Sequence, residues 1–335
     1  MNKVAVAILN YNGESYIKQF LPSLLEHTIN APIYVIDNCS TDSSLDILEN
    51  EFPTVQVIQL RRNLGYAGGY NAGVMSIDAE YIAMVNSDIE VTKDWLDPLL
   101  FFLDGNKDCV AVQPKIKSYH NKELFEYAGA AGGFLDGFGY PYCRGRIFEH
   151  IEKDEGQYDK QTEVFWTSGA CFVIRKLPFE DIGGFDVDFF AHMEEIDLCW
   201  RLKRSNWKLF CISESTVYHV GGGTLSSLNP RKTFLNFRNG LFLLVKNLTR
   251  AEYYKLFLRI VLDWVAALKF TLEGSPSHSI AVLKAHGAFF KLFNREYRKR
   301  SGSYYVLKSI QAKPLRSIVW QRFVGRMRKF SDLHQ

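Results

Sequence analysis

Three groups of polar residues in this sequence have the types and spacing needed for chemistry on a charged ligand. Asn86-Ser87-Asp88 ends one apolar run, Glu194-Glu195-Ile196-Asp197 opens a segment with helical spacing, and His219 ends another apolar run before three glycines. A carboxylate at the end of a buried strand can hold a hard divalent cation through oxygen. A carboxylate partly shielded from water has a raised pKa and can act as a general base near neutrality.

Each group also has a purely structural interpretation. Asp88 or Thr92 could cap a helix expected around Trp95–Leu103, and the acids at 194–197 would be favoured at a helix N-terminus by its dipole. A lone histidine such as His219 is more often structural than a ligand, although the flanking glycines bring bare backbone to the same place. The pair Phe189-Phe190 favours function for the acids, because it should wall them partly from water. Adjacent helical residues project roughly 100° apart, so at most one acid can point squarely at a substrate.

The elements that must position these groups follow a β-α-β pattern. Short β-rich runs alternate with helical stretches at the start of the chain, which predicts a mainly parallel sheet flanked by helices. The runs expected to be strands are Val4–Leu9, Ile33–Ile36, Val55–Leu60 and Tyr81–Val85. Three of them end in polar clusters, namely Asn10-Tyr11-Asn12-Gly13, Asp37-Asn38 and Asn86-Ser87-Asp88. Open α/β sheets bind ligands along the carboxyl edge of their strands, so we expect these clusters to meet there.

Two glycine-rich segments leave more than one interpretation open. Asn63–Gly73 contains four glycines, which suit either close helix packing or contact between backbone and a ligand. Gly129–Gly145 combines glycines with aromatic residues and could be a mobile loop over a site or an irregular connection. Phe165–Ile174 is expected to be a small-residue turn that leads into a strand.

Charge divides the chain into two parts. Residues 1–225 carry 19 Lys and Arg against 32 Asp and Glu, a net −13, whereas residues 226–335 carry 21 against 5, a net +16. We therefore expect a catalytic α/β domain over 1–225 and a basic helical module over 226–335. A segment this basic usually meets phosphate, in nucleic acid or in anionic lipid headgroups.

The basic module contains a long helical pattern over Tyr253–Leu272. Lys255, Arg259 and Asp263 recur every fourth residue as one polar stripe, and Lys269 interrupts the segment again, so an amphipathic helix is expected in place of a membrane span. Together with Ala288–Leu292 and the basic runs Arg295–Arg300 and Arg322–Lys329, it suggests a surface that rests on anionic lipid. The alternative is a helical pair packed on the catalytic domain with a solvated basic face. The aromatic residues do not alternate with basic ones as a nucleic-acid stacking platform would, so no nucleic-acid partner is expected.

The cysteines and the first residues bear on the compartment. The six cysteines are widely spaced and include no C-x-x-C pair, which argues against a zinc ribbon or a disulfide framework and suits a reducing compartment. The apolar run Val4–Leu9 is short and lacks a cleavage site, so we interpret it as a first strand and not as a secretion signal.

Taken together, these segments resemble the family 2 glycosyltransferases, most closely the bacterial branch with rhamnosyltransferases and galactofuranosyltransferases. The resemblance covers roughly residues 3–240, and its motifs occur in the family's order. They are Asn10-Tyr11-Asn12, Val35–Asp42, Asn63-Leu64-Gly65 with Asn71-Ala72-Gly73, Asn86-Ser87-Asp88, Ser168-Gly169-Ala170, Gly183-Gly184-Phe185, Glu194–Asp197 with Arg201, and His219.

The resemblance implies a GT-A fold, a Rossmann-like and mainly parallel mixed sheet flanked by helices, and it implies a role for each matching residue. Asp88 stands at the last position of the family's D-x-D signature and, with His219, would bind Mg²⁺ or Mn²⁺ on the diphosphate, while Asn86 replaces the first Asp. Glu195 would be the catalytic base, with Asp197 second and Glu194 beside them. Nucleotide contacts are implied at Asn10, Tyr11, Asp37, Asn63, Gly65, Asn71 and Asn86, and substrate contacts at Trp166, Ser168, Gly169 and Arg201.

The function implied is inverting transfer of a deoxyhexose or other hexose from a dTDP- or UDP-sugar to a glycan or lipid-linked glycan, in cell-surface polysaccharide synthesis. A polyprenyl-diphosphate-linked acceptor would explain a peripheral position on the inner face of the plasma membrane, and a homodimer is possible. Two alternatives remain. One is a nucleotidyltransferase that makes the activated sugar, although Asn10–Gly13 lacks the basic triphosphate loop such enzymes need. The other is a non-catalytic membrane-surface scaffold or a nucleic-acid binder.

Overall fold

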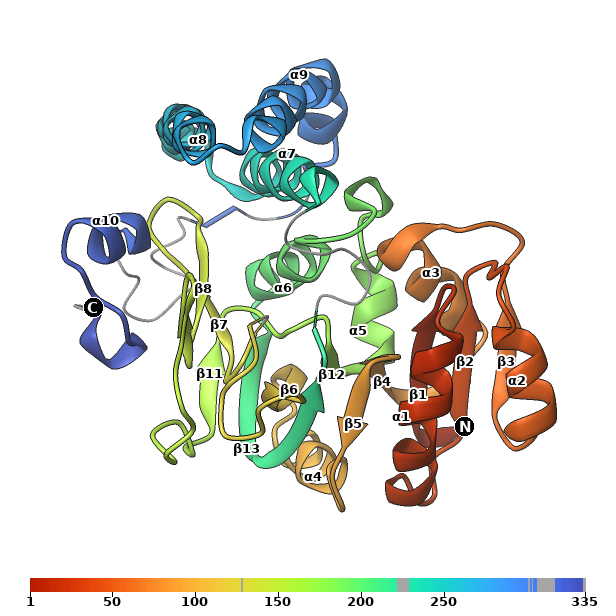
Figure 1. Cartoon of the computed structure of the whole chain (residues 1–335). Helices are drawn as coiled ribbons and strands as arrows, with labels where there is room; N and C mark the ends of the chain where they lie inside the picture. The colour runs from red at the N-terminus through yellow and green to blue at the C-terminus, as the bar shows by residue number, and fades with distance from the viewer. Residues whose placement is uncertain (128, 222–228, 301, 303, 306–316, 334–335) are drawn as a thin grey trace.

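The computed structural model shows a large sheet with helices on both faces and a group of helices at one end (Figure 1). The residues it describes are 1–127, 129–221, 229–300, 302, 304–305 and 317–333.

The first part of the chain forms the parallel half of the sheet, as the alternating pattern predicted. Its strands are β1 (Asn2–Asn10), β2 (Ile33–Asp37), β3 (Gln56–Gln59) and β4 (Ala79–Asn86). The helices between them are α1 (Glu14–His27), α2 (Ser44–Glu51) and α3 (Gly65–Val74). β1 lies between β2 and β4, and all three run parallel, because each connection crosses over through a helix.

The second half of the sheet is mixed, and the strand order is β11-β13-β6-β12-β4-β1-β2-β3, with β5 also pairing with β13. These strands are β5 (Ile89–Val91), β6 (Cys109–Ser118), β11 (Thr162–Val164), β12 (Cys171–Arg175) and β13 (Lys208–His219). β12 runs antiparallel to both β4 and β6. Residues 89–91 form a strand and α4 begins only at Asp97, so the interpretation of Asp88 as a helix cap is wrong.

Each face of the sheet has its own apolar core. One core packs α1, α2 and α4 (Asp97–Gly105) against the sheet through residues such as Leu21, Leu48 and Leu99. The other packs α3, α5 (Lys176–Asp181) and α6 (Glu194–Arg204) on the opposite face, and includes Trp200 and Phe242. A short 3₁₀ helix, η1 (Val187–Phe189), lies in the loop before α6.

The glycine- and aromatic-rich segment is ordered, contrary to both expectations for Gly129–Gly145. It forms part of a small antiparallel sheet of β7 (Gly133–Leu135), β8 (Pro141–Cys143), β9 (Arg146–Ile147) and β10 (His150–Ile151). The final elements α10 (Ile318–Phe323) and η4 (Phe330–Asp332) pack against it in an apolar cluster around Tyr142 and Ile147. Aromatic residues in this segment are therefore core, which explains their density.

The basic module folds as α7 (Pro230–Asn247), η2 (Arg250–Glu252), α8 (Tyr254–Leu272) and α9 (Pro276–Arg298), stacked together at one end of the molecule (Figure 1). α7 contacts α6 and both of the other long helices. The basic module therefore packs on the α/β part through α7, as one of its two alternative interpretations expected. In the described part of the chain, no helix combines the length and apolarity that crossing a membrane requires.

The polar stripe of α8 points into the protein. Lys255, Arg259 and Asp263 are all buried, and Arg259 donates through Nε to Asp263 Oδ1 at 2.9 Å. Asp263 Oδ2 lies 3.3 Å from His286 Nε2 on α9, and the Arg259 guanidinium lies 3.8 Å from the centre of the Tyr140 ring. The amphipathic pattern predicted from the sequence is confirmed, but its polar side packs on the protein and its apolar side is exposed.

Candidate active site

The carboxyl edge of the parallel strands brings the predicted polar clusters together. In the sheet register Asn10 lies opposite Asp37, and Asn86 ends the neighbouring strand on the other side of β1. Asn10 Nδ2 donates to Asp37 Oδ1 at 3.3 Å and to Ser40 Oγ at 3.2 Å, while the Ser40 N–H donates to Asp37 Oδ2 at 3.0 Å. Asn10 and Asp37 are fully buried, whereas Tyr11 is 46% exposed. A fixed carboxylate and an accessible aromatic ring thus lie side by side.

The loop before α3 is fixed at the same edge by Asn38. Its side chain donates to Asn63 Oδ1 and to the Gly65 carbonyl, both at 3.1 Å, and accepts from the Leu64 N–H at 2.9 Å. Gly65 has a φ of +70°, and a Cβ there would lie 2.6 Å from the Phe190 ring, so a glycine is required. Asn63 and Gly65 are therefore positioned beside Asp37, and their nucleotide contact stays a prediction.

The rest of the glycine-rich segment serves helix packing. A Cβ at Gly73 would lie 2.2 Å from Ile36 Cδ1, so the missing side chain lets α3 approach the sheet. Asn71 Nδ2 donates to the Phe185 carbonyl at 2.7 Å, and Asn71 Oδ1 accepts from the Phe185 N–H at 2.9 Å. Both polar atoms of Asn71 hold protein backbone, and a nucleotide contact at Asn71 stays a prediction.

Asp88 and His219 lie together although 131 positions separate them in sequence. His219 Nε2 is 3.2 Å from Asp88 Oδ1, and His219 Nδ1 is 3.4 Å from Glu126 Oε1. Burial disfavours the charged imidazole, but the hydrogen bonds to Asp88 and Glu126 raise the pKa of His219 to about 10. The same contact holds the pKa of Asp88 below its usual range despite burial. The three side chains form a buried locus that favours positive charge.

Glu194 and Glu195 form the first turn of α6, and neither has a counter-ion in the described part of the chain. One carboxylate oxygen of each, Oε2, is buried there without a hydrogen-bond partner. Burial raises the pKa of Glu195 to about 7, and burial together with the charge of Glu195 raises the pKa of Glu194 well above its usual range. A carboxylate with a pKa near 7 is suited to take a proton at neutral pH.

The acid pair borders the same strand end as Asn86. The Tyr66 hydroxyl donates to the Gly169 carbonyl at 2.6 Å, and a Cβ at Gly169 would lie 3.7 Å from Glu195 Cβ. The next residue, Ala170, accepts from the Asn86 N–H at 2.9 Å. The turn Gly169-Ala170 therefore separates Glu195 from the end of β4, which carries the chain to Asp88.

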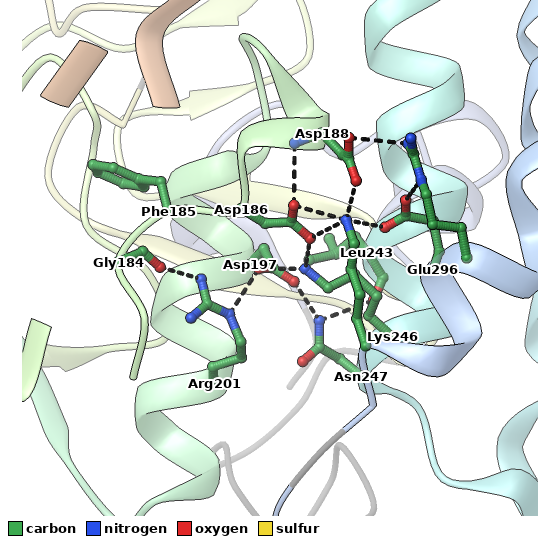
Figure 2. Close-up of polar contacts among 12 residues, drawn as sticks. Gly184, Phe185, Asp186, Asp188, Asp197, Arg201, Leu243, Lys246, Asn247 and Glu296 are labelled. Atoms are coloured by element: carbon green, nitrogen blue, oxygen red, sulfur yellow. Dashed lines mark hydrogen bonds and ion pairs between the residues drawn. The ribbon is translucent and has the colours of Figure 1, made fainter. Parts of the chain in front are cut away.

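Asp197, unlike the acid pair, is surrounded by side chains that donate to it, and Figure 2 shows these contacts. Its fully buried carboxylate accepts from Arg201 Nε at 2.8 Å, from Lys246 Nζ at 2.9 Å and from Asn247 Nδ2 at 2.9 Å. Burial opposes ionisation, but Lys246 and Arg201 hold the pKa of Asp197 well below its usual range. The structure thus gives Asp197 an anchoring role between α6 and α7, where the sequence suggested a second base.

Arg201 is also occupied by the protein. Its Nη1 donates to the Ile182 carbonyl at 2.9 Å and its Nη2 to the Gly184 carbonyl at 2.7 Å. These bonds fix the segment that leads to α6, and the substrate contact expected of Arg201 stays a prediction.

Trp166 and Ser168 support the turn before β12. Trp166 Nε1 donates to the Phe134 carbonyl at 2.9 Å, and the ring is buried. The Ser168 N–H donates to Gln113 Oε1 at 2.8 Å, and Ser168 Oγ accepts from the Ala170 N–H at 3.2 Å. Of the predicted substrate-binding set, Gly169 is the member that borders the acid pair.

Comparison with known proteins identifies the family. A sequence model of glycosyl transferase family 2 matches residues 5–183, more than half of the chain. The chain belongs to glycosyl transferase family 2. An N-acetylglucosaminyl-diphospho-decaprenol L-rhamnosyltransferase of Mycobacterium tuberculosis is 25% identical over 64% of this chain and 75% of its own length. The rhamnosyltransferase WbbL of Escherichia coli is 24% identical over 64% of this chain and 83% of its own length. The predicted family, its rhamnosyltransferase-like branch and the enzyme class are confirmed.

Solved glycosyltransferase structures share the fold. Staphylococcus aureus TarS residues 1–349, in complex with UDP-GlcNAc, matches with a TM-score of 0.56 at 19% identity, covering 89% of this chain and 84% of that one. GalNAc-T7 with UDP, GalNAc and Mn²⁺ matches with a TM-score of 0.57 at 16% identity, covering 76% of this chain and 50% of that one. The predicted GT-A fold with a C-terminal helical region is confirmed.

The residues of this glycosyltransferase at the end of β4 fit a divalent cation. Within the described ranges no group of three or more His, Cys, Asp or Glu residues has the geometry of a complete metal site. Asp88 nevertheless supplies a hard oxygen and His219, once a bound cation has displaced its proton, an imidazole nitrogen, and the two atoms lie 3.2 Å apart. A two-residue set leaves coordination positions for diphosphate oxygens and water, which is how Mg²⁺ is commonly held with phosphate substrates. The flanking glycines Gly222 and Gly223, on which we based part of the His219 prediction, lie outside the described residues.

Glu126 is a site residue that the sequence analysis missed. Its carboxylate faces His219 Nδ1, the nitrogen turned away from Asp88. A carboxylate on the second nitrogen of a metal-binding histidine fixes the ring and its tautomer. Glu126 lies in a stretch without periodicity or a recognisable motif, so no local signal marks it.

The loop before α6, residues 186–193, is the second feature that the sequence did not reveal. Phe190, His192 and Met193 have φ values of +64°, +70° and +72°, a conformation that non-glycine residues rarely adopt. Strain of this kind persists only where surrounding structure enforces it. The loop ends at Glu194, so its shape sets where the acid pair points.

The buried side chain of Asn239 on α7 enforces this shape. Its Nδ2 lies within hydrogen-bonding distance of the carbonyls of Phe189, Ala191 and His192, at 3.0, 2.9 and 2.8 Å. Arg238 Nη2 adds contacts of 3.1 Å to the carbonyls of Asp188 and Phe189. The basic module thus holds the acid-presenting loop directly. Asn239 stands between Arg238 and Gly240, before the apolar run of α7, and this position gives no local signal for its role.

Proposed function

We propose that this glycosyltransferase moves a deoxyhexose or other hexose from a dTDP- or UDP-sugar to a hydroxyl of a glycan or lipid-linked glycan, with inversion at the anomeric carbon. The observation that carries the proposal is the buried pair of acids at the start of α6, each with one carboxylate oxygen that has no hydrogen-bond partner among the described residues, set across the Gly169-Ala170 turn from the end of β4. In this proposal the acid pair at the start of α6 supplies the proton acceptor, and the end of β4 favours a cation beside the diphosphate.

In this proposal Glu195 is the general base. Its pKa near 7 means that a substantial fraction is ionised at neutral pH and that the carboxylate can still accept a proton. Removing the proton from the acceptor hydroxyl lets that oxygen attack the anomeric carbon from the side opposite the leaving diphosphate. The bond from the anomeric carbon to the diphosphate oxygen breaks, and the diphosphate leaves with its electron pair without needing a proton.

On the donor side, Asp37 and Tyr11 would contact the nucleoside, and Asp88 with His219 would hold Mg²⁺ or Mn²⁺. Asp37 is fixed by Asn10 and Ser40, so its carboxylate is oriented before a ligand arrives. A divalent ion bound there supplies positive charge for the departing diphosphate. Glu126 keeps His219 oriented toward Asp88.

The acceptor and the location belong to the same proposal. The Mycobacterium tuberculosis relative is named for a diphospho-decaprenol acceptor, and a polyprenyl-diphosphate-linked glycan suits a chain with a basic module. We place the enzyme at the cytoplasmic face of a membrane, and we retain the division into a catalytic domain (1–225) and a basic module (226–335) as part of this proposal.

A thermal-shift screen with dTDP, UDP and GDP, with and without Mn²⁺, tests the donor side. We expect selective stabilisation by dTDP or UDP that requires the metal and is lost in Asp88→Asn. A transfer assay with the corresponding nucleotide-sugar tests the chemistry, with Glu195→Gln as the inactive variant and exposed Glu49→Gln on α2 as the matched control. Full activity of Glu195→Gln would reject the base assignment. Pyrophosphate release from a nucleoside triphosphate and a sugar phosphate would favour a nucleotidyltransferase.

A further inference from the structure

The outer face of α8 is a continuous apolar stripe. Its members are 38–79% exposed, and they recur at intervals of one to four residues along the helix. They are Tyr254, Phe257, Leu258, Val261, Trp264, Val265, Leu268 and Leu272. Soluble monomers rarely expose contiguous apolar surface of this extent unless it binds something.

The stripe is fixed outward by the charges on the inner side of the helix. Rotating α8 to bury it would expose the Arg259–Asp263 pair and break the contact of Asp263 with His286. Gly240 on α7 makes room for Arg259, because a Cβ there would lie 2.9 Å from Arg259 Nη2. The packing of the basic module therefore keeps the charged side of α8 inside and its apolar side exposed.

Neighbouring elements extend the apolar face and add positive charge to it. Lys269 at the end of α8 lies 5.9 Å from the centre of the Phe323 ring on α10. α10 exposes further apolar residues, and exposed basic residues follow it directly. The exposed apolar residues are Trp320, Phe323 and Val324, and the basic ones are Arg326, Arg328 and Lys329.

The exposed side of α9 repeats this combination. Ile280, Leu283 and Phe290 are exposed, and the lysines Lys284 and Lys291 adjoin two of them in sequence. Apolar side chains bordered by lysine and arginine complement a bilayer, with acyl chains beneath and anionic headgroups around. A second copy of this chain would instead bring two basic rims together, and like charges disfavour that contact.

We propose that the apolar stripe of α8, extended by α10, inserts into the surface of an anionic lipid bilayer with the helix lying in the plane of the membrane. The helix lies on the bilayer and does not cross it, because its inner side carries the buried charges that tie it to α9 and Tyr140. The depth reached by such a face is roughly 5–10 Å, into the boundary between headgroups and acyl chains. This inference concerns a partner of the module and depends on none of the steps proposed for sugar transfer.

Flotation of the purified full chain with vesicles tests it. We compare phosphatidylcholine vesicles with vesicles containing about one third phosphatidylglycerol, and expect binding to the anionic vesicles that weakens as salt is raised. The triple variant Phe257→Ser/Trp264→Ser/Leu268→Ser should bind at least about tenfold more weakly. The matched control Met75→Ser/Phe101→Ser/Leu177→Ser removes three apolar residues that are at least as exposed but lie at or beside other helices, and it should bind like the unmodified chain.

Two further measurements separate insertion into the bilayer from effects on catalysis. Brominated lipids should quench tryptophan fluorescence, and the double variant Trp264→Phe/Trp320→Phe, which removes the exposed tryptophans of α8 and α10, should lose most of that quenching. Transfer to a water-soluble acceptor should be equal in the unmodified chain and the α8 triple variant, so a failure of the proposed chemistry would not be confused with a failure of docking. Undiminished flotation of the α8 triple variant would overturn the proposal. So would a dimer that the triple variant converts to monomer without any lipid binding.

Discussion

Two acidic regions of α6 lie within one helical turn and have opposite electrostatic environments. Glu194 and Glu195 have no cation in contact among the described residues, and their pKa values are raised by burial. Asp197, only two positions further, accepts hydrogen bonds from two cations and an amide, and its pKa is lowered (Figure 2). Burial is common to both regions, so the partners make the difference.

The difference shows how one helix can combine stability with reactivity. Lys246 at the end of α7 bridges Asp197 and Asp186, and Lys299 at the end of α9 binds Asp186 as well. These two lysines therefore neutralise Asp186 and Asp197. Neutralising the acid pair in the same way would hold the helix more firmly, but it would remove the proton acceptor. Among the described residues, Glu194 and Glu195 have no cation in contact, and the helix is anchored through Asp197.

The largest effect should follow from replacing the proposed base. Glu195→Gln keeps the size of the side chain and removes its ability to accept a proton, so the transfer rate should fall roughly 10²–10⁴-fold. Far-ultraviolet circular dichroism and nucleotide-induced thermal shifts should be unchanged, because the donor site lies across the Gly169-Ala170 turn. A variant with near-normal turnover would move the base role elsewhere.

Replacing the anchor should act on stability. Asp197→Asn leaves the buried Lys246 and the partly buried Arg201 beside a neutral amide, and breaking a buried pair such as Lys246–Asp197 costs about 3–5 kcal/mol in free energy of unfolding. Urea unfolding followed by tryptophan fluorescence measures it. The exposed pair Lys208–Asp108 provides the control, because Asp108→Asn should leave the stability nearly unchanged. A stable Asp197→Asn variant without activity would instead favour a direct role in catalysis.

A variant at Asn239 tests whether transfer depends on the geometry of the loop before α6 as well as on the identity of the acids. Asn239→Ala removes the side-chain bonds to three loop carbonyls, and we expect kcat to fall about tenfold or more with little change in KM for the donor, since a misplaced base affects the transition state more than donor binding. Steady-state kinetics separate the two constants. Equal losses of kcat and of folded protein would indicate a structural role alone.

The sequence predicted the parallel half of the sheet and its polar edge well, because each strand there is a continuous apolar run that ends in a polar cluster. The opposite positions of Asn10 and Asp37 follow directly from that pattern. The small sheet β7–β10 escaped prediction, because its strands are only two or three residues long and their aromatic residues pack against the distant elements α10 and η4.

For the site, the sequence identified which acids stand at the start of α6 but not how they differ. The separation of Asp197 from Glu195 depends on Lys246 and Asn247, which lie about fifty residues later and on another helix. The inward orientation of the polar stripe of α8 likewise depends on residues of another helix. Helical spacing shows that Lys255, Arg259 and Asp263 share a side, but only partners such as His286 decide which way that side faces.

The smallest effect should be the stability of Glu195→Gln, and its sign opposes that of Asp197→Asn. Folding raises the pKa of Glu195 from its usual 4.5 to about 7, so between these values the folded chain binds more protons than the unfolded chain. The stability contribution of Glu195 is therefore fully present below pH 4.5 and is lost as pH rises through 7. Glutamine has no such loss, so the variant should match the unmodified chain near pH 4.5 and melt a few degrees higher at pH 8, at roughly 2 °C per kcal/mol. Differential scanning calorimetry at the two pH values measures the difference. A variant that melts lower at pH 8 would mean that Glu195 has a stabilising cation, and the contrast with Asp197 would fail.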